Sequence, residues 1–257
     1  MTILDRIVKT KREEITALKG CRPDLVLPAS PIPRSHRFTK AIRADGLTVI
    51  AEVKKASPSR GVIRHDFDPV SLAIQFEKSG AGALSVLTDG PYFQGSPAYI
   101  SAIRPAVSIP ILRKEFIIDP IQIIESAELG ADAILLIQAI LNPSLCRNLI
   151  DVAHFLNLDV LLEIHTDEEL DIALQIPNVD MIGINNRNLK TFDIDISLAQ
   201  KLNEKIKRIR PDLPVVAESG YRSIDDLKTL ASEEFSAVLI GEGLATNPSL
   251  VNQLRLV

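Results

Sequence analysis

The sequence is poor in cysteine and has no excess of basic residues. Only two cysteines, Cys21 and Cys146, occur in 257 residues, with no Cys-x-x-Cys spacing. They are too few for a disulfide framework or a cysteine-rich zinc site, and they suit a reducing compartment. Lys and Arg number 29 against 33 Asp and Glu, a formal net charge of −4. Because binding to nucleic acid needs a basic surface, no nucleic-acid partner is expected.

Long hydrophobic runs are also missing. The most apolar stretch, residues 131–141, is about half the ~20 residues that a membrane-spanning helix needs. The first twenty residues are charged throughout and lack the apolar core of a secretory signal. We therefore expect no membrane partner and a cytoplasmic location.

The first 46 residues differ from the rest of the chain. Residues 2–18 space Ile3, Ile7, Ile15 and Leu18 among charged residues, which predicts an amphipathic helix. Residues 22–33 hold four prolines and cannot be helical, and a short helix is expected over 38–43. We predict a helical extension over 1–46 that packs on a catalytic domain over 47–257, near its active site, which it would help to shield from water.

From Leu47 onward, eight short apolar runs alternate with amphipathic stretches. The runs are LTVIAEV, ALSVL, IPILRKEF, ADAILLI, DVLLEIH, DMIGIN, LPVVAES and SAVLIG. Continuous apolar strands suit a parallel sheet covered on both faces, so the repeat predicts a single (β/α)8 TIM barrel of the α/β class. An open doubly wound sheet is the alternative, but no glycine-rich turn follows the first strand.

Polar residues interrupt several predicted strands near their carboxyl ends. Those that we select as catalytic candidates are Glu52, Lys54, Lys114, Glu163, Asn185, Glu218 and Ser219. In a barrel these ends meet at the mouth, where the active sites of this fold lie. A single charged residue at a strand end is often only solvated. Several in register are harder to dismiss, because an unpaired buried charge is costly, and paired lysines and glutamates are suited to proton transfer.

Loops rich in small residues suggest an anion site at the same mouth. They are residues 57–61 after the first strand, Ser219-Gly220 after the seventh and Gly241-Glu242-Gly243 after the eighth. Loops after strands seven and eight often bind phosphate in this fold, through exposed backbone N–H groups. Glycines in loops also simply satisfy turns. Glu242 is an awkward neighbour for phosphate, so we expect its side chain to point away.

Other candidates receive a structural interpretation. Arg113 and Glu115 alternate with Lys114, so they are expected to face the helices. Met181 is expected in the core. His165 could reach the rim from its place two residues after Glu163, but we assign it no role. No spacing typical of a metal site is present, so no metal is expected.

Six segments, taken in this order, resemble indole-3-glycerol-phosphate synthases. They are IAEVKKASPSRG, PILRKEFIIDP, LLEIHT, IGINNRNL, VAESG and LIGEGL, and the resemblance runs from about Leu4 to the end of the chain. It implies a carboxy-lyase of tryptophan biosynthesis without cofactor or metal. The small-molecule substrate would be the phosphosugar-anthranilate compound 1-(2-carboxyphenylamino)-1-deoxyribulose 5-phosphate. Ring closure with loss of CO₂ and water would give indole-3-glycerol phosphate.

The resemblance also implies roles for particular residues. Lys114 would protonate the substrate carbonyl, and Glu163 and Lys54 would serve the later dehydration in an order left open. Glu52 would orient the lysines, while Asn185 and Glu218 would contact the substrate. The residues that match the phosphate pocket are Ser57, Ser219, Gly220, Gly241 and Glu242, and Arg187 would bind an anionic group. Glu242 stands where some relatives have Ser.

Two other functions stay open at this stage, and a monomer is expected. A Schiff-base aldolase could use Lys54 or Lys114 as its nucleophile. A phosphate-binding barrel without catalysis is the third possibility, although the three rim glutamates argue against a pure anion receptor.

Overall fold

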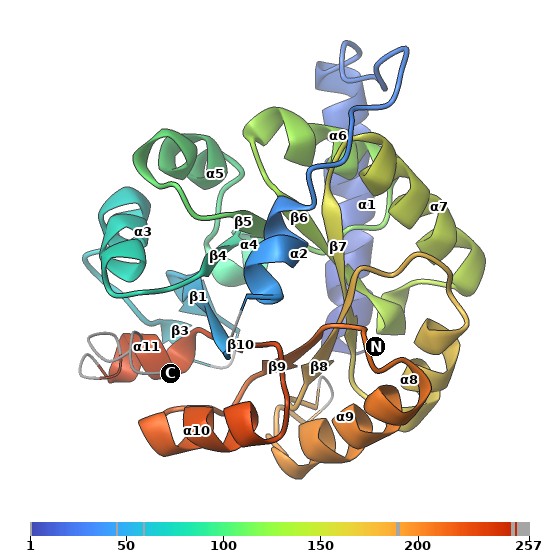
Figure 1. The fold of residues 1–257 in the computed structure, drawn as a ribbon. Helices are drawn as coiled ribbons and strands as arrows, with labels where there is room; N and C mark the ends of the chain where they lie inside the picture. The colour runs from blue at the N-terminus through green and yellow to red at the C-terminus, as the bar shows by residue number, and fades with distance from the viewer. Residues whose placement is uncertain (1, 45, 59, 189–190, 248–249, 251–257) are drawn as a thin grey trace.

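Eight parallel strands close into a barrel within the part of the chain that the structure describes. The structure, a computed structural model, describes residues 2–44, 46–58, 60–188, 191–247 and 250. The strand order is β1-β10-β9-β8-β7-β6-β5-β4, and β1 pairs with both β10 and β4 (Figure 1). The strands are β1 (Thr48–Val53), β4 (Ala83–Leu87), β5 (Ile111–Lys114), β6 (Ala133–Ile137), β7 (Asp159–Ile164), β8 (Met181–Asn185), β9 (Val215–Glu218) and β10 (Ala237–Ile240). The predicted TIM barrel is confirmed, and the open sheet is wrong.

Helices surround the barrel. They are α3 (Pro69–Lys78), α4 (Gly90–Phe93), α5 (Ala98–Ile103), α6 (Pro120–Leu129), α7 (Pro143–Phe155), α8 (Asp167–Leu174), α9 (Ser197–Ile209), α10 (Ile224–Ser232) and α11 (Glu242–Thr246). Asp119 and Asn142 cap α6 and α7, each with proline as the first helical residue. A short hairpin, β2 (Ala56–Ser57) and β3 (Gly61–Val62), follows β1 and was not predicted. Among the described residues, no helix is both long and apolar enough to span a bilayer.

A short helix fills the amino-terminal end of the barrel. Phe38 and Ile42 of α2 (Arg37–Ile42) are fully buried and pack with inward-facing residues such as Leu112 and Met181. In Figure 1 this helix lies in front of the strands. The expectation that Met181 belongs to the core is confirmed. Because apolar side chains close this end, a ligand can enter only from the other.

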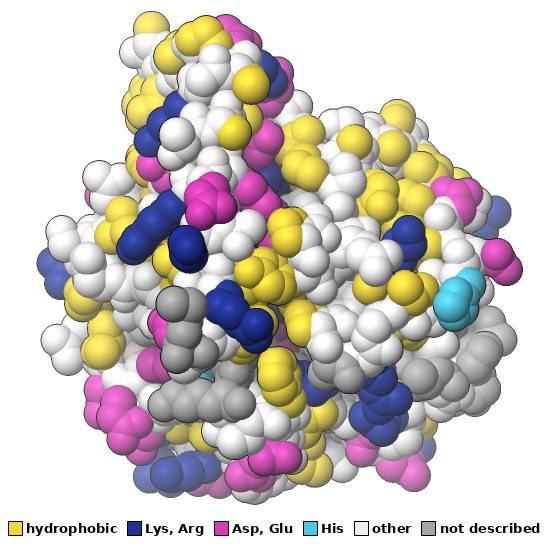
Figure 2. All heavy atoms as spheres, turned by 180° about the vertical axis from the view of Figure 1, so that it is seen from behind, with side chains coloured by type: hydrophobic (Ala, Val, Ile, Leu, Met, Phe, Trp, Pro, Cys, Tyr) yellow, Lys and Arg dark blue, Asp and Glu magenta, His cyan; other side chains and the backbone are white. Residues whose placement is uncertain are grey.

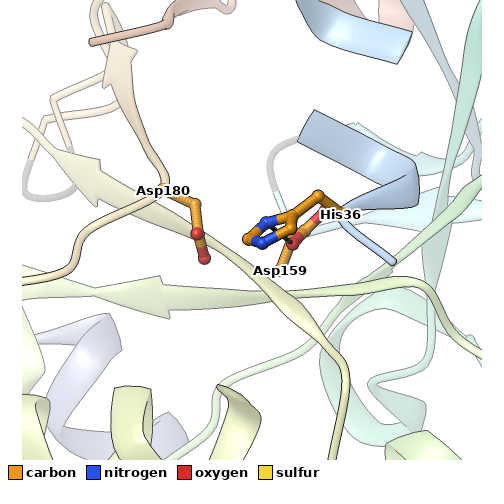
Figure 3. Close-up of side chains that lie close together, drawn as sticks. All are labelled: His36, Asp159 and Asp180. Atoms are coloured by element: carbon orange, nitrogen blue, oxygen red, sulfur yellow. Dashed lines mark ion pairs between the residues drawn. The ribbon is translucent and has the colours of Figure 1, made fainter. Parts of the chain in front are cut away.

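Charged residues fasten α2 at the same end. His36 precedes α2, and it lies close to Asp159 at the start of β7 and Asp180 just before β8 (Figure 3). Such a group has ligands that a metal could use. However, Nη2 of Arg34 lies 2.6 Å from Asp159 Oδ1 and 3.0 Å from Asp180 Oδ1. Since a cation would have to compete with this guanidinium, we interpret the cluster as an ionic clamp that holds the segment before α2.

The amino-terminal helix crosses the opposite end. Helix α1 (Ile3–Cys21) begins at a capping box formed by Thr2 and Asp5, and it lies behind the strands in Figure 1. Nζ of Lys11 is buried against the barrel, 2.8 Å from Asp89 Oδ2 and 3.0 Å from Glu115 Oε1. Burial lowers the pKa of Lys11, but the charges of Glu115 and Asp89 outweigh it and raise that pKa above its usual value.

We expect Lys11→Ala to loosen α1, because it leaves two buried carboxylates without their cation. Removing one partner of a buried ion pair costs about 3–5 kcal/mol. Urea unfolding and the rate of proteolysis within α1 would measure the loss. Lys9→Ala, at an exposed position of the same helix, should change the free energy of unfolding by less than about 0.5 kcal/mol. Equal stability and equal protection of α1 in both variants would contradict this account of the cluster.

Candidate active site

Side chains from alternate strands meet in one pocket at the carboxyl ends of the strands. Glu52 of β1, Lys114 of β5, Glu163 of β7 and Glu218 of β9 all line it. Successive strand residues point to opposite faces, and these four occupy inward positions. Register brings further groups alongside, since Asn185 of β8 pairs with Glu218. The predicted candidates therefore share one cavity. Figure 2 shows this end of the molecule, where Lys and Arg side chains lie among apolar ones.

Lys114 is at the centre of the charged groups. Its Nζ lies 2.9 Å from Glu163 Oε2 and 2.9 Å from Glu218 Oε2. Beside it, Lys54 Nζ lies 3.1 Å from Glu52 Oε2. Residue exposure is only 8% for Glu52, 3% for Glu163 and 1% for Glu218. Charges this deeply buried are stable only in pairs, and each is paired here.

The protonation states follow from this arrangement. Burial lowers the pKa of Lys114, but Glu163, Glu218 and Glu52 outweigh it and raise the pKa well above its usual value. Burial raises the pKa of Glu163, but Lys114 and His165 reverse that effect and hold the pKa well below its usual value. For Glu218, burial raises the pKa to about 8, with Lys114 opposing and Glu163 reinforcing the shift. Near neutral pH, Lys114 is a cation and Glu163 an anion, while Glu218 holds its proton more strongly than an ordinary carboxylic acid.

Two glycines leave room for these side chains. A Cβ on Gly183 of β8 would collide with Glu218 Oε1. A Cβ on Gly241, just after β10, would collide with Glu52 Oε2 and lie 2.8 Å from Lys54 Nζ. Any larger residue would displace a charged group, so both positions require glycine because of the site itself.

The predicted anion loops form one side of the pocket. Ser219 and Gly220 follow β9 in left-handed conformations, with φ of 67° and 103°, and both line the pocket with Gly241. Ser57 of β2 and Arg187 after β8 line it too. Asn185 Oδ1 accepts a hydrogen bond from the Arg187 backbone N–H at 3.0 Å, which fixes the start of that loop. Ser59, part of the predicted anion-binding segment, lies outside the described residues.

Glu242 does not turn toward solvent. Its side chain is 13% exposed, and its carboxylate pairs with Arg60, with Arg222 at 3.1 Å and with Arg187 at 3.5 Å. Two guanidinium groups, those of Arg187 and Arg222, therefore line the pocket beside the predicted anion loops, and Arg60 joins them through the Glu242 carboxylate. Sequence analysis assigned a role only to Arg187, although Arg60 lies in a segment that it selected and Arg222 follows Gly220 by two residues.

Part of the pocket wall is apolar. Residues of α1, of α4 and of the loops after β5 and β8 form it, namely Ile3, Leu4, Ile7, Phe93, Phe116, Phe192 and Ile194. The apolar stripe of α1 led us to expect this helix near the mouth of the barrel, and its residues do line the pocket, but the other residues of the wall were not selected from the sequence. Arg113 faces the surrounding helices, as predicted, and bonds to Gln122 and Glu125 of α6. Glu115 pairs with Lys11 of α1, but it also lines the pocket.

A closed α/β barrel with an ammonium group between carboxylates at its mouth is typical of a TIM-barrel enzyme that uses proton transfer. A family model described as indole-3-glycerol phosphate synthase matches residues 4–257. Three curated proteins of that name support the match. The protein of Chlorobium luteolum is 50% identical over 255 residues, covering 97% of this chain and 95% of its own. That of Chlorobium phaeovibrioides is 45% identical over 258 residues, covering 97% of each chain. That of Thermoanaerobacter pseudethanolicus is 43% identical over 241 residues, covering 93% of this chain and 91% of its own.

The chain belongs to the indole-3-glycerol phosphate synthase family. It carries that synthase function, a carboxy-lyase activity of tryptophan biosynthesis.

The raised pKa of Glu218 predicts how stability depends on pH. The folded protein keeps a proton up to about pH 8 that the unfolded chain, with its ordinary pKa of 4.5, has already released. The stabilisation from this group is therefore complete below pH 4.5 and is lost as pH rises through about 8. We expect Glu218→Gln, which stays uncharged, to lose less stability over that range than the wild type. Urea unfolding at a series of pH values would measure it.

Glu168→Gln is the matched control, since Glu168 is exposed on α8. It should follow the pH dependence of the wild type. A Glu218→Gln variant that also followed the wild-type curve would show that Glu218 is ionised throughout this range.

Proposed function

We propose that Lys114 is the general acid of the ring closure. As the aromatic ring attacks the substrate carbonyl, the carbonyl oxygen becomes more basic and needs a proton donor within hydrogen-bond reach. The observation that carries this assignment is the position of Lys114 Nζ, 2.9 Å from carboxylates on two different strands. Those carboxylates keep the ammonium protonated in a buried place and aim it at the cavity.

For the dehydration, we assign Glu163 as the base and Lys54 as the acid. This step needs one group that removes a proton from carbon and another that protonates the leaving hydroxyl. The lowered pKa of Glu163 keeps it ionised and able to accept a proton. Lys54, held by Glu52 at 3.1 Å, is the second cation of the pocket. Glu52 thus serves as the orienting group, and Asn185 and Glu218 as polar contacts for the substrate.

The substrate would lie across the mouth with its phosphate on the arginine side. Ser219, Gly220 and Gly241 provide backbone there, and Arg60 and Arg222 provide charge. The apolar wall, with Ile3 and Ile7 of α1, suits the benzene ring at the other end. Every group in this assignment comes from one chain, which is consistent with a monomer.

The site also bears on the alternative functions. A Schiff-base lysine must be a neutral amine, whereas the charges around Lys114 favour its ammonium form. Borohydride in the presence of substrate should therefore trap no adduct. A pure anion receptor would gain nothing from three buried glutamates facing an anionic ligand.

We expect Lys114→Ala to lower kcat at least about 100-fold, the range for loss of a general acid. The assay would follow indole fluorescence with the carboxyphenylamino substrate. Lys40→Ala, on the exposed side of α2 at the closed end, should keep wild-type turnover. Circular dichroism should show both variants folded. A folded Lys114→Ala variant with normal kcat would overturn the assignment.

We expect Arg222→Ala to act on binding. Losing one charge-assisted hydrogen bond to the phosphate, worth about 1.5 kcal/mol, should raise KM about 10-fold with kcat little changed. Competitive inhibition by inorganic phosphate should weaken as well. Arg147→Ala, at an exposed position of α7, is the control and should change neither. A fall in kcat at constant KM would show that Arg222 does not bind the phosphate end.

A further inference from the structure

His165 contacts the proposed base from the side opposite Lys114. It follows β7 directly, and its Nε2 lies 3.1 Å from Glu163 Oε1, while Lys114 Nζ lies 2.9 Å from Glu163 Oε2. The two oxygens of this carboxylate thus have different cationic partners. The imidazole is 7% exposed, so the pair is shielded from water.

A second carboxylate fixes the ring from behind. Glu169 of α8 places Oε2 3.4 Å from His165 Nδ1, and the same oxygen accepts the His165 backbone N–H at 2.7 Å. A carboxylate therefore lies near each ring nitrogen, as an ion pair with Nε2 and as a hydrogen bond with Nδ1, and both favour the charged imidazolium. Burial lowers the pKa of His165, but Glu163 and Glu169 outweigh it and raise the pKa to about 9.

We propose that His165 is a positioning residue that holds Glu163 ionised and oriented while Lys114 gives up its proton. The proposal rests on the roles assigned above to Glu163 and Lys114. It adds Glu169 as the group that orients His165, so the ionic chain runs from Lys114 through Glu163 and His165 to Glu169.

The proton balance of the reaction explains why His165 is needed as a cation beside Glu163. The substrate receives one proton at its carbonyl oxygen and one at its leaving hydroxyl, and it gives one up from carbon. Loss of CO₂ and water then leaves a net uptake of one proton per turnover. When Lys114 donates its proton to the substrate, Glu163 loses the positive charge nearest to it. This buried carboxylate would then tend to take up a proton. The imidazolium of His165 remains beside Glu163 and opposes its protonation.

The same cation makes Lys114 a stronger acid. The negative charge of Glu163 raises the pKa of Lys114. The positive charge of His165 beside Glu163 partly offsets that negative charge and so weakens its effect. Without His165, Lys114 should hold its proton more tightly and donate it more slowly. A change of one pKa unit corresponds to a factor of about 10.

Dependence on pH follows from the groups that face the ring. These are Glu163 from β7 and Glu169 from α8, with Lys114 of β5 beyond Glu163 and Glu218 of β9 beyond Lys114. His165 is a cation below about pH 9 and loses its charge above it. Wild-type kcat should therefore fall as pH rises through about 9, and the variant without His165 should lack this limb.

The test is His165→Gln, assayed for kcat and KM across the pH range. We expect kcat at neutral pH to fall about 10-fold with KM within about 2-fold, the alkaline limb to disappear and the acid limb to move upward as Glu163 becomes easier to protonate. Glu169→Gln should give the same changes to a smaller degree. An unaltered pH profile in a folded His165→Gln variant, whatever its kcat, would overturn the proposal.

His154→Gln is the matched control. His154 also contacts a carboxylate, with Nε2 2.8 Å from Asp180 Oδ2, but at the closed end of the barrel. It should keep the wild-type profile. Glu163→Gln tests the proposed base separately from His165. If Glu163→Gln retains turnover, the assignment of Glu163 fails. If Glu163→Gln is inactive and His165→Gln is unaffected, only the role of His165 is refuted.

Discussion

The contact of one buried ammonium with two carboxylates organises the mouth of this barrel. Lys114 extends from β5 to Glu163 on β7 and Glu218 on β9, at 2.9 Å from each. Without that cation, the negative charge of Glu163 would lose its nearest partner in a dry cavity, beside a second carboxyl group. The ion pairs therefore fix the distances between alternate strands as well as the protonation of the groups that react.

Two neighbouring residues at the end of β5 have different tasks, since one belongs to the reacting groups and the other anchors α1. Lys114 reaches Glu163 and Glu218 inside the barrel, whereas Glu115, directly after β5, pairs with Lys11 of α1. Because strand side chains alternate, the same backbone segment that places the proposed acid also places α1, whose Ile3 and Ile7 line the pocket. A shift of this segment would thus move the acid and the apolar wall together. The closed end, filled by Phe38 and Ile42, contributes stability without taking part in binding.

The strands and the charged residues at the mouth of the barrel could be predicted from sequence, because each depends on a short stretch of the chain. Apolar runs at regular spacing predict strands, and a charge in such a run is costly enough to mark a site, as at Glu52, Lys114 and Glu163. Partners far apart in the chain could not be predicted. Arg34 meets Asp159 across 125 residues, and the grouping of Arg60 and Arg222 around Glu242 depends on how three loops close. Alternation on a strand gives the side on which a residue lies, but not the residue that it meets there.

These pairings bear on how an acidic protein can bind a substrate with two anionic ends. The cations of the pocket have carboxylate partners within the protein itself: Lys114 is held by Glu163, and Arg187 and Arg222 by Glu242. On the proposed roles, an incoming phosphate exchanges partners with guanidinium ions that are already oriented, so that folding, rather than binding, has met part of the cost of ordering them. Glu242 then holds the arginines at the phosphate end, as Glu163 holds the lysine at the reacting end. It keeps the cations in place until the substrate's own charge arrives, which explains why a carboxylate can stand beside a phosphate site without abolishing it.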